Sequence, residues 1–182
     1  DRLRSVALWF QQLWAESLGK ARNLDGLRTP TGPTPVAALG ASDQHSFLQL
    51  LMEGPDDKVV MFVEVEDHGV DAPIPKRHPE MSEFAYLGGH SLGDLMNTER
   101  RATAEALRLA GRPNATFHVP SIGPETLGQL LMLLQIATVY AGALYRVDPL
   151  DQPGVELSKQ LTYGLMGREG VARPEIREGD PR

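Results

Sequence analysis

The sequence contains no cysteine. Disulfide bonds, thiolate metal ligands and a cysteine nucleophile are therefore excluded, and a reducing compartment is the natural setting for such a chain. Positive charge is also scarce, because 18 lysine and arginine residues are outnumbered by 24 aspartate and glutamate residues, for a net charge of −6. Since no basic run with interleaved aromatic residues occurs either, we expect no binding to nucleic acid.

Long hydrophobic runs are missing as well. The most apolar stretch, Leu127–Leu144, is interrupted by Gln129, Gln135 and Gly142, which predicts a buried helix of a globular protein rather than a membrane span. The first residues do not form the charged and then apolar pattern of a signal peptide. We therefore expect a cytoplasmic protein that does not bind membranes.

The residues that are present predict an α/β protein. Hydrophobic residues make up 41% of the 182 positions and charged residues 23%, which is typical of a single globular domain. Helical and extended patterns alternate along the chain, and such alternation predicts a parallel sheet covered by helices on both faces. The patterns predict helices over about 3–19, 42–53, 91–110 and 127–144, a further helix starting at Pro153, and strands over 35–40, 58–65 and 115–119.

Two observations suggest that the sequence is part of a longer protein. Three strands are few for a parallel sheet, and an amphipathic helix that Asp1 can cap begins at once. Beyond Gly167 the chain is charged and contains two prolines, so we expect residues 167–182 to form a loose tail.

The first candidate site follows the predicted strand that ends at Gly40. Ligands of open parallel sheets bind at the carboxyl ends of the strands. His45 falls in the first turn of the next helix, where the helix dipole favours a neutral imidazole that can accept or donate a proton. The alternative is that Ser42 or Asp43 simply caps this helix and that His45 is solvated.

The second candidate site surrounds Pro153, which suits the first turn of a helix. Gln152 precedes it and can donate a hydrogen bond to a ligand hydroxyl. Lys159 lies roughly two turns further along, and its long side chain can return to the same place. The alternative is a capped helix on which Lys159 is exposed.

Other motifs are weaker. The segment Gly88–Gly93 lacks the Lys-Ser/Thr ending of a phosphate-binding loop, and Ser91 as a helix cap explains it. The acidic cluster between Glu64 and Asp71 has no recognisable metal-ligand spacing and suits a solvated loop. We therefore expect no metal ion at this cluster.

Two segments together resemble the glucose-6-phosphate isomerase family. The run Leu150–Lys159 matches its C-terminal signature, Asp-Gln-x-Gly-Val-Glu, two residues and Lys, although Ser158 and Pro153 replace the usual Gly and a frequent Trp. The run Gly40–Leu50 resembles the family segment Gly-x-x-x-Gln-His-Ser/Ala. The likeness extends from about Asp1 to Leu165.

The resemblance implies a fold and a reaction. The fold is the sugar isomerase (SIS) fold, a three-layer α/β/α sandwich with a mostly parallel sheet, here over residues 1–166 and without its upstream strands. The reaction is the reversible conversion of glucose 6-phosphate to fructose 6-phosphate in glycolysis and gluconeogenesis, carried out in the family by a homodimer without a cofactor.

The resemblance also implies residue roles. His45 and Lys159 help to open the sugar ring by proton transfer, and Gln152 contacts the sugar-phosphate substrate. A glutamate then moves a proton between C2 and C1 through a cis-enediol. We expect this glutamate, the catalytic arginine and most phosphate-binding residues to lie upstream of Asp1, so the chain alone should be inactive.

Two alternatives remain from the sequence. The chain can be a non-catalytic SIS-type module that binds a sugar phosphate for regulation, which would not need the pair of His45 and Lys159. It can also be a partner-binding scaffold that presents an exposed sheet edge.

Overall fold

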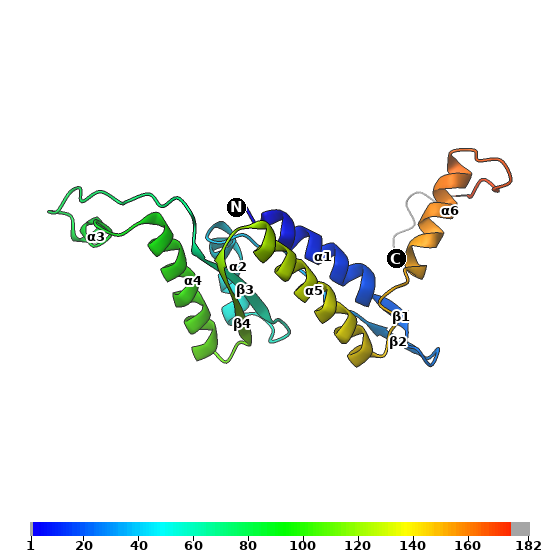
Figure 1. Ribbon diagram of the computed structural model, residues 1–182. Coiled ribbons are helices and arrows are strands. Elements are labelled where there is room, and N and C mark those ends of the chain that lie inside the picture. The colour runs from blue at the N-terminus through cyan, green and yellow to red at the C-terminus, as the bar shows by residue number, and fades with distance from the viewer. Residues whose placement is uncertain (1, 176–182) are drawn as a thin grey trace. The chain divides into compact units, whose positions relative to one another are not determined.

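The computed structural model describes residues 2–175, so the predicted cap Asp1 and residues 176–182 of the predicted tail lie outside the described residues. Figure 1 labels the helices and strands in chain order. The helices are α1 (Arg4–Leu18), α2 (Ser42–Glu53), α3 (Ser82–Ala85), α4 (Leu92–Leu109), α5 (Pro124–Tyr145) and α6 (Glu156–Leu165), with a 3₁₀ turn, η1 (Pro153–Val155), before α6; the strands are β1 (Lys20–Arg22), β2 (Arg28–Thr31), β3 (Val60–Asp67) and β4 (Asn114–Ser121).

The chain divides into two compact units. The first unit contains the residues up to Gln11 together with Val36–Leu134, and the second contains Gln12–Pro35 together with the residues from Gln135 onward. His45 therefore belongs to the first unit, and Gln152 and Lys159 belong to the second.

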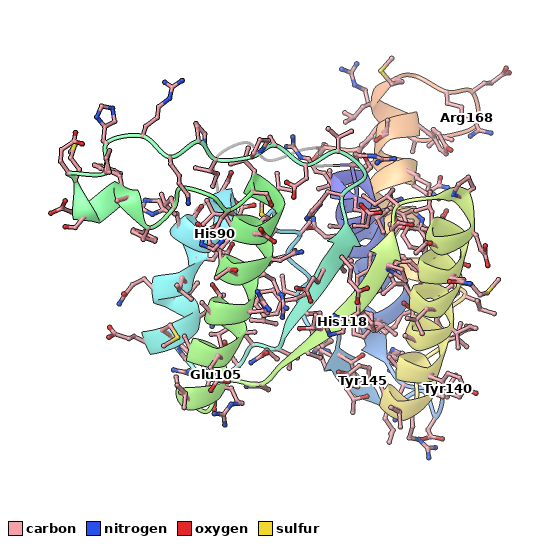
Figure 2. All side chains as sticks on the ribbon, turned by 60° about the vertical axis from the view of Figure 1, so that its left-hand side comes forward. His90, Glu105, His118, Tyr140, Tyr145 and Arg168 are labelled. Carbon is pink, nitrogen blue, oxygen red and sulfur yellow. The ribbon has the colours of Figure 1, made fainter. Side chains whose placement is uncertain are left out.

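The first unit is built on the parallel strand pair β3–β4, which confirms the parallel pairing predicted from sequence. Helix α4 packs on both strands and α2 packs on α4, as Figure 2 also shows. Side chains of α4 contact this face of the pair directly: Asn97 Nδ2 donates to the Val65 carbonyl at 3.2 Å, and Arg100 Nη2 lies 2.6 Å from Glu64 Oε2. Leu107 of α4 is fully buried and marks the core.

Helix α4 begins where the sequence predicts. Ser91 Oγ accepts a hydrogen bond from Asp94 N at 3.0 Å, and Asp94 Oδ2 accepts one from Ser91 N at 3.3 Å. This reciprocal pair is a capping box, which satisfies main-chain N–H groups that have no partner within the helix. Gly111, with φ of 72°, follows the end of the helix and adopts the left-handed conformation that favours glycine.

The predicted strand over residues 35–40 is wrong, because the structure has irregular chain there. Pro35 has no N–H group and so cannot donate a hydrogen bond to a neighbouring strand. Ala37 N donates instead to Gln11 Oε1 at 2.8 Å, and Leu39 N donates to Asp43 Oδ2 at 2.7 Å. Because side chains satisfy these main-chain groups, no partner strand is needed. The predicted capping of α2 by Ser42 or Asp43 is also wrong, since Ala41 is its N-cap residue and makes no side-chain cap hydrogen bond.

The second unit contains an antiparallel hairpin, β1–β2, which is not among the strands predicted from the sequence. Thr31 Oγ1 donates to the Leu18 carbonyl at 3.1 Å, and Leu18 is fully buried. The chain after α5 is tied to the hairpin because Arg146 Nη2 contacts both carboxylate oxygens of Asp25, at 2.9 and 2.8 Å, and Leu24 N donates to the Arg146 carbonyl. After α6, Arg168 lies 4.5 Å from the centre of the Tyr163 ring.

Helix α5 is buried along one stripe only. Leu130, Leu134 and Thr138, spaced by four residues, are buried, whereas Tyr140 and Leu144 are 69% and 85% exposed. The prediction of a helix is confirmed, but the prediction that it is buried holds only for this stripe. By length and composition alone α5 is apolar enough to cross a membrane, a test that core helices of soluble proteins also pass.

Candidate active site

His45 lies in the first turn of α2 and is exposed. The preceding residue is held firmly, because Gln44 Nε2 donates to Thr103 Oγ1 at 2.5 Å and to the Glu99 carbonyl at 3.2 Å. Thr103 is itself buried in α4. The start of α2 is therefore fixed to α4 while the imidazole of His45 remains accessible.

Gln152 lies immediately before η1, and Pro153 occupies the first turn as predicted. The Gln152 side chain makes no cap hydrogen bond. Its Nε2 donates instead to Glu16 Oε2 at 3.1 Å, across 136 residues of sequence. The amide predicted to contact a ligand is thus paired with a carboxylate.

Lys159 lies in α6 and about half of its side chain is exposed. Its Nζ donates to Glu156 Oε1 at 2.6 Å. This hydrogen bond, together with the attraction between the two charges, raises the pKa of Lys159 above its ordinary value. The ammonium form therefore persists to higher pH than in a free lysine.

The predicted residues come from two units. Gln152 and Lys159 lie on consecutive elements of the second unit, whereas His45 lies in the first. The meeting of His45 and Lys159 stays a prediction.

Glu16 is a carboxylate that the sequence analysis missed. It lies in the last turn of α1, where Gln12 Nε2 donates to Oε1 at 3.2 Å and Gln152 Nε2 donates to Oε2 at 3.1 Å. A signal was present in the sequence, because Glu16 and Lys20 form an acidic and basic pair at the helix end marked by Gly19. That pattern does not reveal the distant amide, which only the fold brings to Glu16.

The acidic cluster between Glu64 and Asp71 does not gather into a metal site. Within residues 2–175, no group of three or more histidine, aspartate or glutamate side chains is placed to hold a metal ion. The prediction that this cluster is a solvated loop is wrong for Glu64, which is only 8% exposed in β3 and pairs with Arg100 and, at 2.9 Å, with His118 of β4.

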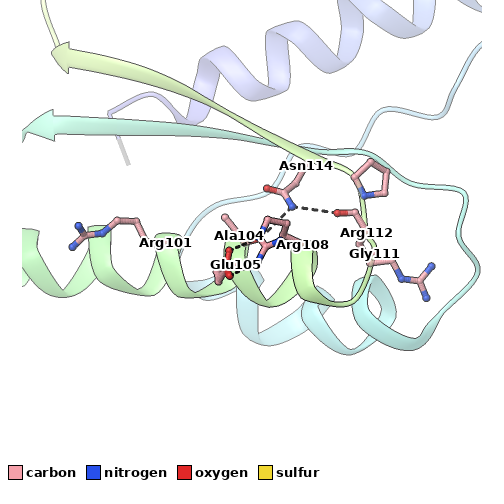
Figure 3. Close-up of a pocket in the computed structure, with 8 residues that line it drawn as sticks. Arg101, Ala104, Glu105, Arg108, Gly111, Arg112 and Asn114 are labelled. Carbon is pink, nitrogen blue, oxygen red and sulfur yellow. Dashed lines mark hydrogen bonds and ion pairs between the residues drawn. The ribbon is translucent and has the colours of Figure 1, made fainter.

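A shallow open depression lies at the C-terminal end of α4 (Figure 3). Three of its polar residues are already engaged with protein partners, because Arg108 makes two hydrogen bonds of 2.7 Å to Glu105 and Asn114 Nδ2 donates to the carbonyls of Ala104 and Arg112. None of the predicted site residues lines it. We therefore do not assign the site to this depression.

Comparison with known proteins identifies relatives across nearly the whole chain. The family described as phosphoglucose isomerase matches residues 1–170. The glucose-6-phosphate isomerases of Rubrobacter xylanophilus and Carboxydothermus hydrogenoformans are 52% and 45% identical over 170 residues, which is 93% of this chain but only 38% and 37% of theirs. The chain thus spans less than two fifths of the length of these relatives.

Solved structures that resemble this chain also cover about nine tenths of it. A hypothetical protein from Thermus thermophilus superimposes with a TM-score of 0.84 at 40% identity, covering 92% of this chain and 39% of that one. A glucose-6-phosphate isomerase from Chlamydia trachomatis gives a TM-score of 0.76 at 23% identity, a likeness of fold that covers 91% of this chain and 32% of the other.

Proposed function

Since this chain belongs to the phosphoglucose isomerase family, we propose that it forms part of an enzyme that interconverts glucose 6-phosphate and fructose 6-phosphate. The observation that carries this proposal is the hydrogen bond between the amide of Gln152 and the carboxylate of Glu16. This contact supports the proposal because a carboxylate, which is able to accept a proton, lies next to the residue predicted to contact the substrate.

The reaction has two chemical requirements. The sugar ring must open, which needs a proton donor and a proton acceptor near the ring and anomeric oxygens. A proton must then pass between C2 and C1, which needs a base and positive charge to stabilise the developing enediolate. We assign ring opening to His45 and Lys159, and substrate contact to Gln152.

We propose Glu16 as the base that moves the proton between C2 and C1. From the family resemblance, this glutamate was expected upstream of Asp1. Glu16 is supported instead by its contact with Gln152 and by its place on the last turn of α1, directly before the buried residues Ser17 and Leu18. In this role its carboxylate takes the C2 proton and returns it to C1 of the cis-enediol.

The remaining features of the enzyme are expectations from the family. We propose that residues 1–166 belong to a SIS-type α/β/α sandwich, completed by strands from a longer protein, and that the enzyme is a cytoplasmic homodimer without a metal or organic cofactor. The catalytic arginine and most phosphate-binding residues are expected from that longer protein, so the chain alone should not turn over substrate.

The first test is a coupled assay of glucose 6-phosphate formation from fructose 6-phosphate, using the longer protein that contains this sequence. We expect His45→Ala, Lys159→Ala and Glu16→Gln each to lower kcat by about 10²- to 10⁴-fold, the usual contribution of a positioned acid or base. Matched controls are His90→Ala and Glu105→Gln, which alter exposed side chains of the first unit (Figure 2) and should leave kcat unchanged.

Two other outcomes would change the assignment. Activity that survives Glu16→Gln would return the base to an upstream glutamate. A parent protein that binds a hexose phosphate but converts neither would support the non-catalytic sugar-phosphate-binding module in place of the enzyme.

A further inference from the structure

Lys20, the first residue of β1, is a buried lysine, with only 5% of its side chain exposed. An ammonium group carries three N–H donors. Lys20 Nζ lies 2.9 Å from the Glu16 carbonyl, 2.6 Å from the Asp151 carbonyl and 3.3 Å from Asp151 Oδ1. Two of the donors therefore have carbonyl acceptors, and the charge is paired with the Asp151 carboxylate, as a buried charge requires.

These acceptors come from two distant parts of the chain. The Glu16 carbonyl belongs to the last turn of α1, where carbonyls lack helical partners and carry the negative end of the helix dipole. Asp151 is 131 residues from Lys20 and directly precedes Gln152. The Lys20 ammonium thus joins the end of α1 to the turn that presents Gln152.

The same two segments meet a second time through their side chains. The Glu16 carbonyl accepts a hydrogen bond from Lys20, and the Glu16 carboxylate accepts one from the Gln152 amide. Lys20 therefore holds the main chain on both sides of the Glu16–Gln152 hydrogen bond. If the Lys20 contacts were lost, the turn would be free to move relative to α1. The Glu16 carboxylate and the Gln152 amide would then no longer be held at hydrogen-bonding distance.

Lys20 is not itself available to a substrate. Its ammonium donates to two carbonyls and is paired with the Asp151 carboxylate, and its side chain is covered, so a phosphate or hydroxyl group would have to displace a protein acceptor. Other contacts also stiffen the turn: Asp148 Oδ1 accepts from Leu150 N at 2.8 Å, and Pro149 packs so closely on Gly142 that a Cβ there would lie 2.9 Å from Pro149 Cγ.

We propose that Lys20 is a positioning residue for the isomerase site, which sets the distance and orientation of Gln152 relative to Glu16. The inference rests on the proposed function for its effect on turnover. Its effect on the turn at Asp151 and Gln152 does not depend on that function and can be measured separately.

The test uses the longer protein with Lys20→Met, which keeps an unbranched side chain one atom shorter and removes the donors. We expect kcat to fall about 10- to 100-fold with a smaller change in KM, since misplacement by about 1 Å can cost that much. Hydrogen exchange of the main-chain amides of residues 150–152 should accelerate about 10-fold or more, because the turn loses its anchor. The matched control, Lys58→Met, alters a more exposed lysine of the first unit and should change neither quantity.

A double-mutant cycle separates positioning from general stability. If Lys20 acts through the turn, Gln152→Ala should lower kcat by a smaller factor in the Lys20→Met background than in the wild type, because the two changes remove the same alignment. A purely structural lysine would give independent effects on turnover.

A second variant tests the inference in case Lys20→Met does not fold. Asp151→Asn removes the charged acceptor but keeps the Asp151 carbonyl, and Asp151 is half exposed, so folding should be retained. It should change kcat and exchange in the same direction by smaller amounts. Folded variants with wild-type kcat and wild-type exchange at residues 150–152 would overturn the inference. An inactive longer protein would overturn the proposed function, and the exchange measurement would still decide whether Lys20 holds the turn.

Discussion

At the scale of single residues, the most informative electrostatic feature is the pair formed by Lys159 and Glu156. The hydrogen bond from the Lys159 ammonium to the Glu156 carboxylate raises the pKa of the lysine. A lysine that stays protonated over a wider pH range is suited to stabilise negative charge, whereas its raised pKa makes the ammonium a weaker proton donor. Because both side chains are about half exposed, salt should weaken the pair.

Glu156→Gln tests this pair through the pH dependence of turnover. The carboxylate raises the lysine pKa, so its removal should lower that pKa toward the ordinary value and the protonated form should be lost at lower pH. If protonated Lys159 is required, the alkaline limb of the kcat–pH profile of the longer protein should therefore shift to lower pH. Glu105→Gln removes an equivalent carboxylate from Arg108 and should leave the profile in place. An alkaline limb that does not move in Glu156→Gln would show that the limb belongs to another group.

At the scale of elements, α4 is the helix on which the first unit is organised. Its side chains contact β3, β4 and α2, and it holds Gln44 next to His45. The capping box at its start determines where this contact surface begins. Changes to the cap should therefore affect the stability of the unit more than changes at other exposed serines.

Ser91→Ala should destabilise the protein by about 1 kcal/mol, the usual cost of losing a helix cap. Denaturant unfolding measures this change, and hydrogen exchange in the first turn of α4 locates it. Ser158→Ala, an exposed position inside α6, serves as control and should change stability little. Equal effects of the two substitutions would contradict the assigned role of Ser91.

At the scale of the whole molecule, large apolar side chains remain exposed on both units. In the second unit these include Tyr140, Leu144, Leu150, Leu157 and Met166, which are 69–85% exposed. Contiguous exposed apolar surface promotes association with other apolar surfaces. Residues 1–182 alone should therefore bind a hydrophobic dye such as ANS more strongly than the longer protein does, and should self-associate as concentration rises. Dye fluorescence and light scattering check this expectation, and a monodisperse monomer with no dye binding would contradict it.

The sequence by itself determined the features that local patterns encode. The helical periodicity of apolar residues predicted α1, α4 and α5, the run of β-branched residues predicted β3, and Ser91 and Pro153 marked the starts of α4 and η1. These signals succeed because the residues that determine each element lie within a few positions of one another. The predicted strand at 35–40 failed because its apolar character was a local signal without a partner strand, and distant side chains satisfied its N–H groups.

Only the tertiary structure decided which distant groups meet. Local sequence singled out Gln152 and Lys159, but it did not reveal that Glu16 lies against Gln152 across 136 residues, or that Lys20 holds Asp151 across 131 residues. The same is true of Glu64, which looked like part of a solvated acidic loop and is buried against Arg100 and His118. Such pairings depend on how helices and strands pack, and no local periodicity carries that information, which is why the candidate base and its anchor emerged only from the folded chain.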